Sequence, residues 1–232
     1  MEKTTILNTK NFKKWILPIL MFLAYKYYSK NIVKLSVVYG LKSFAMIYFI
    51  AHVVGILFFI CLIHFVYKDK FNSIDNSKKM NLLKSVLISI VVFIISYNFD
   101  KIISIIIYNV FGNVKSINDS VIKASEKVSI FTYFEVSFAG PILEEIVYRQ
   151  LLFGYLYDLH SGCNKYIRFI TASIVSSIVF GSIHNGAFHP YMLYYVTSGI
   201  ILSSLYVYTK RLSSPIIVHI LINLIPYLRR LL

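Results

Sequence analysis

Acidic residues are scarce in this sequence, since Asp and Glu together number only 10 among 232 residues. Charged residues of both signs make up 15% of the chain, whereas ordinary soluble domains contain about 25%. Hydrophobic residues make up 57%. This shortage of charge excludes an ordinary soluble domain. We therefore predict an integral membrane protein of the all-α class, folded as a polytopic transmembrane helical bundle.

Cysteine is also scarce. The two cysteines, Cys61 and Cys163, are far apart in the chain, and neither lies in a CxxC pair. Two isolated thiols exclude a disulfide framework, so we expect both to be reduced.

Basic residues outnumber acidic ones and give a formal net charge of +14, which in a soluble protein would suggest nucleic acid. Here they are dispersed in short polar segments between apolar stretches, as the positive-inside rule produces in a membrane protein. We therefore predict a lipid bilayer, and no nucleic acid, as a partner. The basic segments 159–168 and 209–213 are expected to be cytoplasmic, and the mixed or neutral segments 113–128 and 185–190 to lie outside.

Long apolar stretches predict seven membrane spans. They cover residues 15–28, 43–67, 85–112, 129–158, 169–184, 190–208 and 214–228. An eighth span results if 85–112 is interrupted at Asn98-Phe99-Asp100, where Asp100 is expected to pair with Lys101 or to lie in a loop. No motif is found in residues 1–128, so we treat them as an N-terminal transmembrane region, and residues 129–232 as the region that carries the chemistry.

Small residues four positions apart mark two of the predicted spans. They include Ser173, Ser177 and Gly181 in one span, and Gly199 and Ser203 in the next. Such spacing lets helix backbones approach closely in lipid, so we predict tight packing within residues 169–208.

Two adjacent glutamates, Glu144 and Glu145, interrupt an apolar stretch that continues to Arg149. Ionisable residues at membrane depth are costly and therefore indicate a functional site. Positions four apart share a helix face, so Glu145 is expected to pair with Arg149. Glu144, rotated by about 100°, is left to face another partner. Pro141 suits the first turn of a helix, which we expect to begin there.

Other polar residues in apolar surroundings are candidate partners of Glu144. His184 lies at the end of one predicted span, and His219 and Asn223 share one face of the last span. Because an unpaired buried polar group costs about 1–3 kcal/mol, these groups are expected to converge. A simple up-and-down arrangement leaves His184 and His219 near opposite ends of the bundle, so tilted or broken helices are needed to bring them together.

A carboxylate beside an imidazole can take a proton from water, and an imidazole with a carboxamide can donate hydrogen bonds to an oxyanion. A divalent metal such as zinc, held by Glu144, His184 and His219, is the alternative left open. The sequence has no HExxH, GxSxG or GxGD motif. With these other protease motifs absent, hydrolysis by water activated at Glu144 is the mechanism that remains.

The patterns Glu144-Glu145-x-x-x-Arg149, Phe180-x-x-x-His184 and His219-x-x-x-Asn223 resemble the three motifs of the CPBP family, the CAAX-type prenyl endopeptidases and their bacterial relatives, also called Abi proteins. The resemblance covers roughly residues 129–228 and implies an intramembrane protease.

It assigns water activation to Glu144 with His184 and oxyanion stabilisation to His219 with Asn223. Glu145 and Arg149 complete the first motif, with Arg149 orienting the site.

The resemblance implies a membrane-associated or small secreted peptide as the substrate, with a role in peptide maturation or bacteriocin self-immunity. The expected location is the bacterial cytoplasmic membrane. Two other functions remain open: a non-catalytic membrane scaffold or immunity protein that binds a partner through the same fold, and a transporter, although no matched repeat of the two halves is visible.

Overall fold

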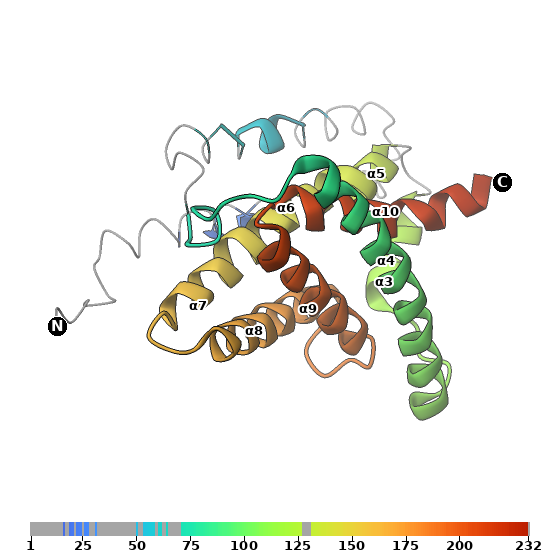
Figure 1. Cartoon of the computed structure of the whole chain (residues 1–232). Helices are drawn as coiled ribbons and strands as arrows, with labels where there is room; N and C mark the ends of the chain where they lie inside the picture. The colour runs from blue at the N-terminus through green and yellow to red at the C-terminus, as the bar shows by residue number, and fades with distance from the viewer. Residues whose placement is uncertain are drawn as a thin grey trace.

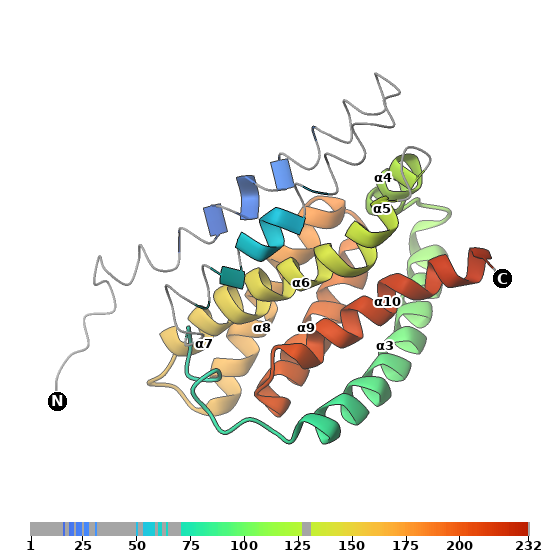
Figure 2. The same ribbon diagram turned by 90° about the horizontal axis from the view of Figure 1, so that it is seen from above.

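The computed structural model describes residues 71–126 and 131–231, together with separate positions between 16 and 64, and within these ranges it contains helices and no strand. Most of the predicted spans 15–28 and 43–67 lies outside the described residues. The helices are α3 (Leu82–Phe111), α4 (Ile117–Glu126), α5 (Phe131–Phe134), η2 (Glu135–Ala139), α6 (Gly140–Glu145), η3 (Ile146–Phe153), α7 (Gly154–Leu159), α8 (Lys165–Asn185), α9 (Met192–Thr209) and α10 (Ser213–Leu231). The all-helical fold is confirmed, and Figures 1 and 2 show its arrangement.

Helix α3 is a single helix of 30 residues, so of the two alternatives for 85–112 the uninterrupted helix is the one observed. Asn81 caps its start, where the side-chain oxygen accepts a hydrogen bond from the backbone N–H of Lys84 at 3.2 Å. The expectation for Asp100 is wrong. Its carboxylate is buried and accepts a hydrogen bond from Ser198 Oγ of α9 at 3.1 Å. Lys101 points elsewhere and lies over the Tyr97 ring.

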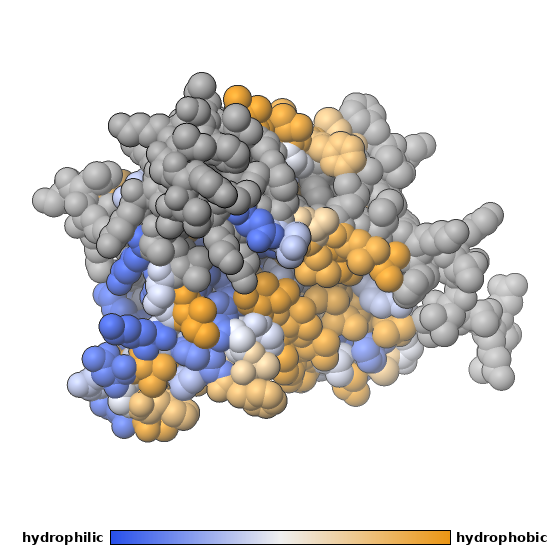
Figure 3. Space-filling model, turned by 180° about the vertical axis from the view of Figure 1, so that it is seen from behind, coloured by the Kyte–Doolittle hydropathy of each residue, from blue (hydrophilic) through white to orange (hydrophobic). Residues whose placement is uncertain are grey.

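Helix α3 has the polarity of a membrane helix. Its buried positions include Ser85, Ser89, Ser96 and Asp100, whereas its exposed positions are mostly Leu, Ile, Val and Phe. In water such an apolar surface would be buried instead, so lipid is the natural surrounding of this face. Figure 3 shows apolar residues gathered over one side of the molecule.

Two described helices, α3 and α8, are long and apolar enough to cross a membrane. Because α3 is uninterrupted, the eighth span is lost, and the total of seven spans stays a prediction.

Helices α8 and α9 pack closely through small residues, as predicted. Ser173, Ser177, Gly199 and Ser203 are all buried. A Cβ atom placed on Gly199 would lie 2.6 Å from Ser177 Oγ, so only a glycine fits at this approach.

Residues 131–159 form one continuous helix from α5 to α7 that contains two π-helical stretches, η2 and η3. The helix therefore does not begin at Pro141, because Ala139 and Gly140 already have helical backbone angles. It runs beside α10 and α8, as Figure 2 shows. π-Helical turns change the direction of side chains and often occur at functional sites. Here they flank Glu144 and Glu145 on both sides.

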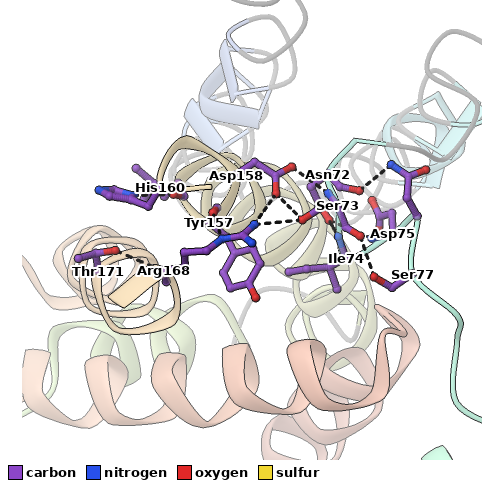
Figure 4. A network of polar contacts seen from close by, with 12 residues as sticks. Asn72, Ser73, Ile74, Asp75, Ser77, Tyr157, Asp158, His160, Arg168 and Thr171 are labelled. Atoms are coloured by element: carbon purple, nitrogen blue, oxygen red, sulfur yellow. Dashed lines mark hydrogen bonds and ion pairs between the residues drawn. The ribbon is translucent and has the colours of Figure 1, made fainter. Parts of the chain in front are cut away.

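The loop before α3 is attached to this long helix by polar contacts (Figure 4). Ser73 donates to Asp158 at the end of α7 through both its backbone N–H, at 2.8 Å, and its hydroxyl group. Arg168 of α8 pairs with the same carboxylate at 3.4 Å. Deeper in the protein, Asn72 Nδ2 donates to the carbonyl oxygen of Gln150 in η3 at 2.8 Å. These bonds join three separate segments and fix one end of the helix that carries the glutamates.

Candidate active site

A cavity of about 440 Å³ lies between the long helix, α8, α9 and α10. Four of the six residues predicted for the site line it: Glu144, His184, His219 and Asn223. The other two, Glu145 and Arg149, lie behind the wall of the cavity and are fully buried. Thus the structure brings together residues from three separate sequence motifs.

Glu145 and Arg149 form the predicted ion pair one helical turn apart. Arg149 Nε lies 3.1 Å from Glu145 Oε2, and both side chains are at most 1% exposed. The guanidinium group also stacks over the ring of Phe180, with Cζ 4.8 Å from its centroid. The ion pair lies within the long helix, and the contact of Arg149 with Phe180 joins this helix to α8.

His219 is oriented by Glu145. Its Nδ1 lies 2.8 Å from Glu145 Oε1, and since a carboxylate can only accept, Nδ1 carries the hydrogen. This leaves Nε2 of His219 directed at Glu144, 3.8 Å from Oε2. Glu145 therefore binds Arg149 through one oxygen and His219 through the other, which explains why two adjacent glutamates are needed.

His184 approaches Glu144 from another helix. Its Nδ1 donates to the carbonyl oxygen of Phe180 at 2.8 Å, so its Nε2 faces Glu144 Oε2, 3.5 Å away. The imidazole ring stacks on Tyr195, with ring centroids 4.6 Å apart and an interplanar angle of 19°. Both histidines thus direct Nε2 at the same carboxylate oxygen. A simple up-and-down bundle would keep these two histidines apart. The long helix with its π-helical turns departs from that arrangement and carries Glu144 to both of them.

Asn223 lines the cavity one turn beyond His219. Its Nδ2 donates to the carbonyl oxygen of Val136 in η2 at 2.9 Å, which uses one of its two amide hydrogens. Glu135 is half-buried and lines the same cavity.

Lys26 is a residue of the site that the sequence analysis did not identify. Its ammonium group forms an ion pair with Glu144 Oε1, the oxygen that the histidines do not face. Lys26 interrupts the apolar stretch 15–28, and the same signal drew attention to Glu144: an ionisable residue among apolar ones. Its sequence position, 118 residues before Glu144, gave no reason to connect the two.

The proposed metal ligands are not arranged around a common point. Zinc binds histidine nitrogen and carboxylate oxygen at about 2.0–2.2 Å. Among the described residues, no three His, Cys, Asp or Glu side chains are placed to hold one ion. In addition, the Lys26 ammonium occupies Glu144 Oε1, and a second cation there would be repelled. The side chains as placed therefore do not fit a metal ion.

Part of the chain is similar to known membrane proteases. Residues 126–225 match the family model described as type II CAAX prenyl endopeptidase Rce1-like. The chain is 38% identical over 127 residues to the membrane-embedded CAAX protease MroQ of Staphylococcus aureus, an alignment that covers 54% of this chain and 50% of the relative. It is 34% identical over 157 residues to the putative membrane peptidase YdiL of Bacillus subtilis, covering 65% and 59%.

The chain thus spans between half and three-fifths of the length of these two relatives. No solved structure matches it.

Proposed function

Residues 126–225 belong to the CPBP family of CAAX-type membrane proteases, and on this premise we propose that the chain is an intramembrane endopeptidase that uses water activated by Glu144. The observation that carries the proposal is the meeting of two imidazole nitrogens on one buried carboxylate inside a cavity, with Glu144 only 6% exposed. A carboxylate needs such partners to act as a base where bulk water is excluded.

In the proposed mechanism, a water molecule binds in the cavity beside Glu144 and His184. Glu144 takes one proton from the water, and the water oxygen forms a bond to the carbonyl carbon of the peptide. The carbonyl electron pair moves to the oxygen and gives a tetrahedral oxyanion. The proton then passes to the leaving nitrogen, the carbon–nitrogen bond breaks, and a carboxyl group and an amine result.

His219 and Asn223 are proposed to stabilise the oxyanion. Asn223 has a second amide hydrogen besides the one it gives to Val136. Glu145 holds the ring of His219 at 2.8 Å and is itself held by Arg149, so these two residues orient the site without contacting the substrate. Hydrogen-bond donors held in place in this way stabilise the oxyanion effectively, because they need no rearrangement as its negative charge develops. No step in this mechanism requires a metal ion.

The substrate is proposed to be a membrane-associated or small secreted peptide, because the reactive carboxylate lies in an apolar bundle rather than on a soluble surface. Peptide maturation, or self-immunity to a bacteriocin, in the bacterial cytoplasmic membrane is the proposed setting. Residues 129–232 are proposed as the catalytic core. The preceding region contributes to it, since α3 packs on α9 and α10 and Lys26 contacts Glu144.

The test is cleavage by purified protein in lipid nanodiscs. Membrane-associated peptides are incubated with wild type and with Glu144→Gln, and new termini are identified by mass spectrometry. We expect wild type to cleave, and the variant to be slower by about 10²- to 10⁴-fold, the usual contribution of a general base. Ser204→Ala is the control, because it alters an exposed position of α9 outside the cavity.

Undiminished cleavage by Glu144→Gln overturns the mechanism. A wild-type protein that binds the peptide and never cleaves it overturns the activity, and favours a membrane scaffold or immunity protein instead. Peptide uptake into sealed vesicles without cleavage favours a transporter.

A further inference from the structure

Lys26 lies outside the segment 126–225 that matches the protease family, yet its ammonium group contacts the carboxylate at the centre of the proposed site. Packing holds it there. Phe22, one turn earlier, is 1% exposed and meets the ring of Tyr148 edge-on, with centroids 5.6 Å apart. Lys26 Nζ lies 5.6 Å from the centroid of the Phe22 ring. Phe22 thus packs against Tyr148 of η3, one turn before the position from which Lys26 reaches Glu144.

The exposure of this ion pair differs from that of its neighbour. In the pair formed by Arg149 and Glu145, both side chains are at most 1% exposed, as expected of a structural ion pair. In the pair formed by Lys26 and Glu144, the glutamate is 6% exposed and the lysine 35%. Lys26 also lines the cavity. Lys26 therefore borders the space that a substrate would fill, and its flexible stem allows small movements there.

The charges at this position change in a defined way during the proposed reaction. Before the reaction, the Lys26 ammonium is balanced by the Glu144 carboxylate. When Glu144 takes the proton from water, its carboxyl group becomes neutral, and at the same time a negative charge appears on the carbonyl oxygen of the peptide. An ammonium group close to both the Glu144 carboxylate and the peptide carbonyl oxygen therefore has a negatively charged partner before and after this step. In an apolar cavity such a pre-placed cation stabilises the developing charge more than it would in water.

We propose that Lys26 is a further catalytic residue, which donates a hydrogen bond from its ammonium group to the oxyanion of the tetrahedral intermediate. The proposal rests on the peptidase function proposed above. Lys26 keeps its proton throughout. The proton from water resides on Glu144 until the leaving nitrogen takes it, the carbon–nitrogen bond breaks, and the oxyanion returns its electron pair to the carbonyl group. Lys26 then pairs with Glu144 again.

The test separates turnover from binding. Lys26→Met keeps the length of the side chain and removes its charge, whereas Lys26→Arg keeps the charge. We expect Lys26→Met to lower kcat by about 10²- to 10³-fold, as for loss of one oxyanion donor, while KM changes by less than about 3-fold. Peptide affinity measured in the Glu144→Gln background, with and without Lys26→Met, provides an independent check that binding is intact.

Chemical rescue excludes a purely structural role. Both native cysteines, Cys61 and Cys163, are free and exposed, so they are first replaced by serine. Lys26→Cys is then introduced and alkylated with 2-bromoethylamine, which restores an ammonium group at the length of lysine. We expect most of the lost kcat to return. Alkylation with a neutral reagent of similar size, iodoacetamide, is the matched control and should restore nothing.

The outcomes distinguish the two proposals. If wild type cleaves in a Glu144-dependent way and Lys26→Met keeps its kcat within a few-fold, or raises KM alone, the role of Lys26 is overturned and the peptidase function stands. If the ammonium and the neutral adduct restore kcat equally, the role of Lys26 is likewise overturned. If wild type does not cleave, or cleaves without Glu144, both proposals fail.

Discussion

Asn223 of α10 donates its amide hydrogen to the carbonyl oxygen of Val136, 2.9 Å away in η2. The reason lies in Pro141. In η2 the N–H of Gly140 bonds the carbonyl oxygen of Glu135, five residues earlier, and the next bond in this series would join residue 141 to Val136. Proline has no N–H, so the Val136 carbonyl would be left unpaired in an apolar bundle. The side chain of Asn223 replaces the missing bond and ties the last helix to the glutamate helix.

This relationship predicts that a backbone N–H at position 141 can substitute for Asn223. Asn223→Ala should lower stability by about 1 kcal/mol, because it removes the hydrogen bond to a half-buried carbonyl oxygen. Pro141→Ala in the same chain should restore most of that stability. Thermal unfolding in detergent, monitored by far-UV circular dichroism, measures both effects.

Peptide cleavage by the double variant then separates the two roles of Asn223. Recovered stability with cleavage still impaired supports a role at the oxyanion. Recovery of both would show that Asn223 acts only on η2, and no recovery of stability would contradict the replacement of the backbone bond.

Much of the site could be predicted from the sequence where the partners are local. The pair of Glu145 with Arg149 follows from their spacing of four residues, and the structure contains it. The close approach of α8 and α9 follows from small residues at the same spacing. The convergence of His184 and His219 on Glu144 was predicted from the cost of burying them apart, although not from helix geometry.

Other features depend on partners that the sequence does not identify. Asp100 was assigned to its neighbour Lys101, but it is paired with Ser198, 98 positions away on another helix. The carbonyl oxygen of Val136 in η2 accepts a hydrogen bond from Asn223, a side chain of a different helix. Lys26 lies 118 positions from Glu144. Helical periodicity relates residues within one segment, so it carries no information about which segments meet in three dimensions.

The contact between Gly199 and Ser177 predicts a steric test of the α8–α9 packing. A Cβ atom at position 199 would lie 2.6 Å from Ser177 Oγ and 2.8 Å from its Cβ. Gly199→Ala should therefore destabilise the protein by about 1–3 kcal/mol, the usual range for overpacking. A lower unfolding temperature in detergent is the expected measurement.

Two further variants control for the gain in helix propensity from alanine. Ser177→Gly in the Gly199→Ala background removes the clashing atoms and should recover part of the loss. Ser204→Ala, on an exposed face of α9, should have almost no effect. A Gly199→Ala protein as stable as wild type would contradict the close packing of these helices.

Asp75, in the loop before α3, predicts a pH dependence of stability. Burial raises the pKa of its carboxyl group above the ordinary value, although hydrogen bonds from Tyr206 and Gln150 and the charge of Lys79 act in the opposite direction. The folded protein therefore binds this proton more tightly than the unfolded chain does. The stabilising contribution is fully present below the unfolded pKa of about 3.9 and is lost as pH rises through the higher folded pKa.

Asp75→Asn should remove this contribution from the pH profile. We expect the unfolding temperature of wild type to fall relative to that of Asp75→Asn as pH rises from about 4 through the raised pKa. Ser77→Ala, in the same loop and without a titrating group, should keep the wild-type profile. Parallel profiles for wild type and Asp75→Asn would contradict the raised pKa.

The arrangement around Glu144 predicts how the proposed activity responds to metal removal. Nε2 of His184 and of His219 lie 3.5 and 3.8 Å from Glu144 Oε2, and among the described residues no three His, Cys, Asp or Glu side chains are placed to hold one ion. The ammonium of Lys26 adds a positive charge at the other carboxylate oxygen. We therefore expect cleavage to persist after dialysis against EDTA and 1,10-phenanthroline. Loss of cleavage that returns with stoichiometric zinc would contradict this. In that case Lys26→Met should bind zinc more tightly than wild type, since it removes the competing cation, and isothermal titration of both proteins would measure the difference.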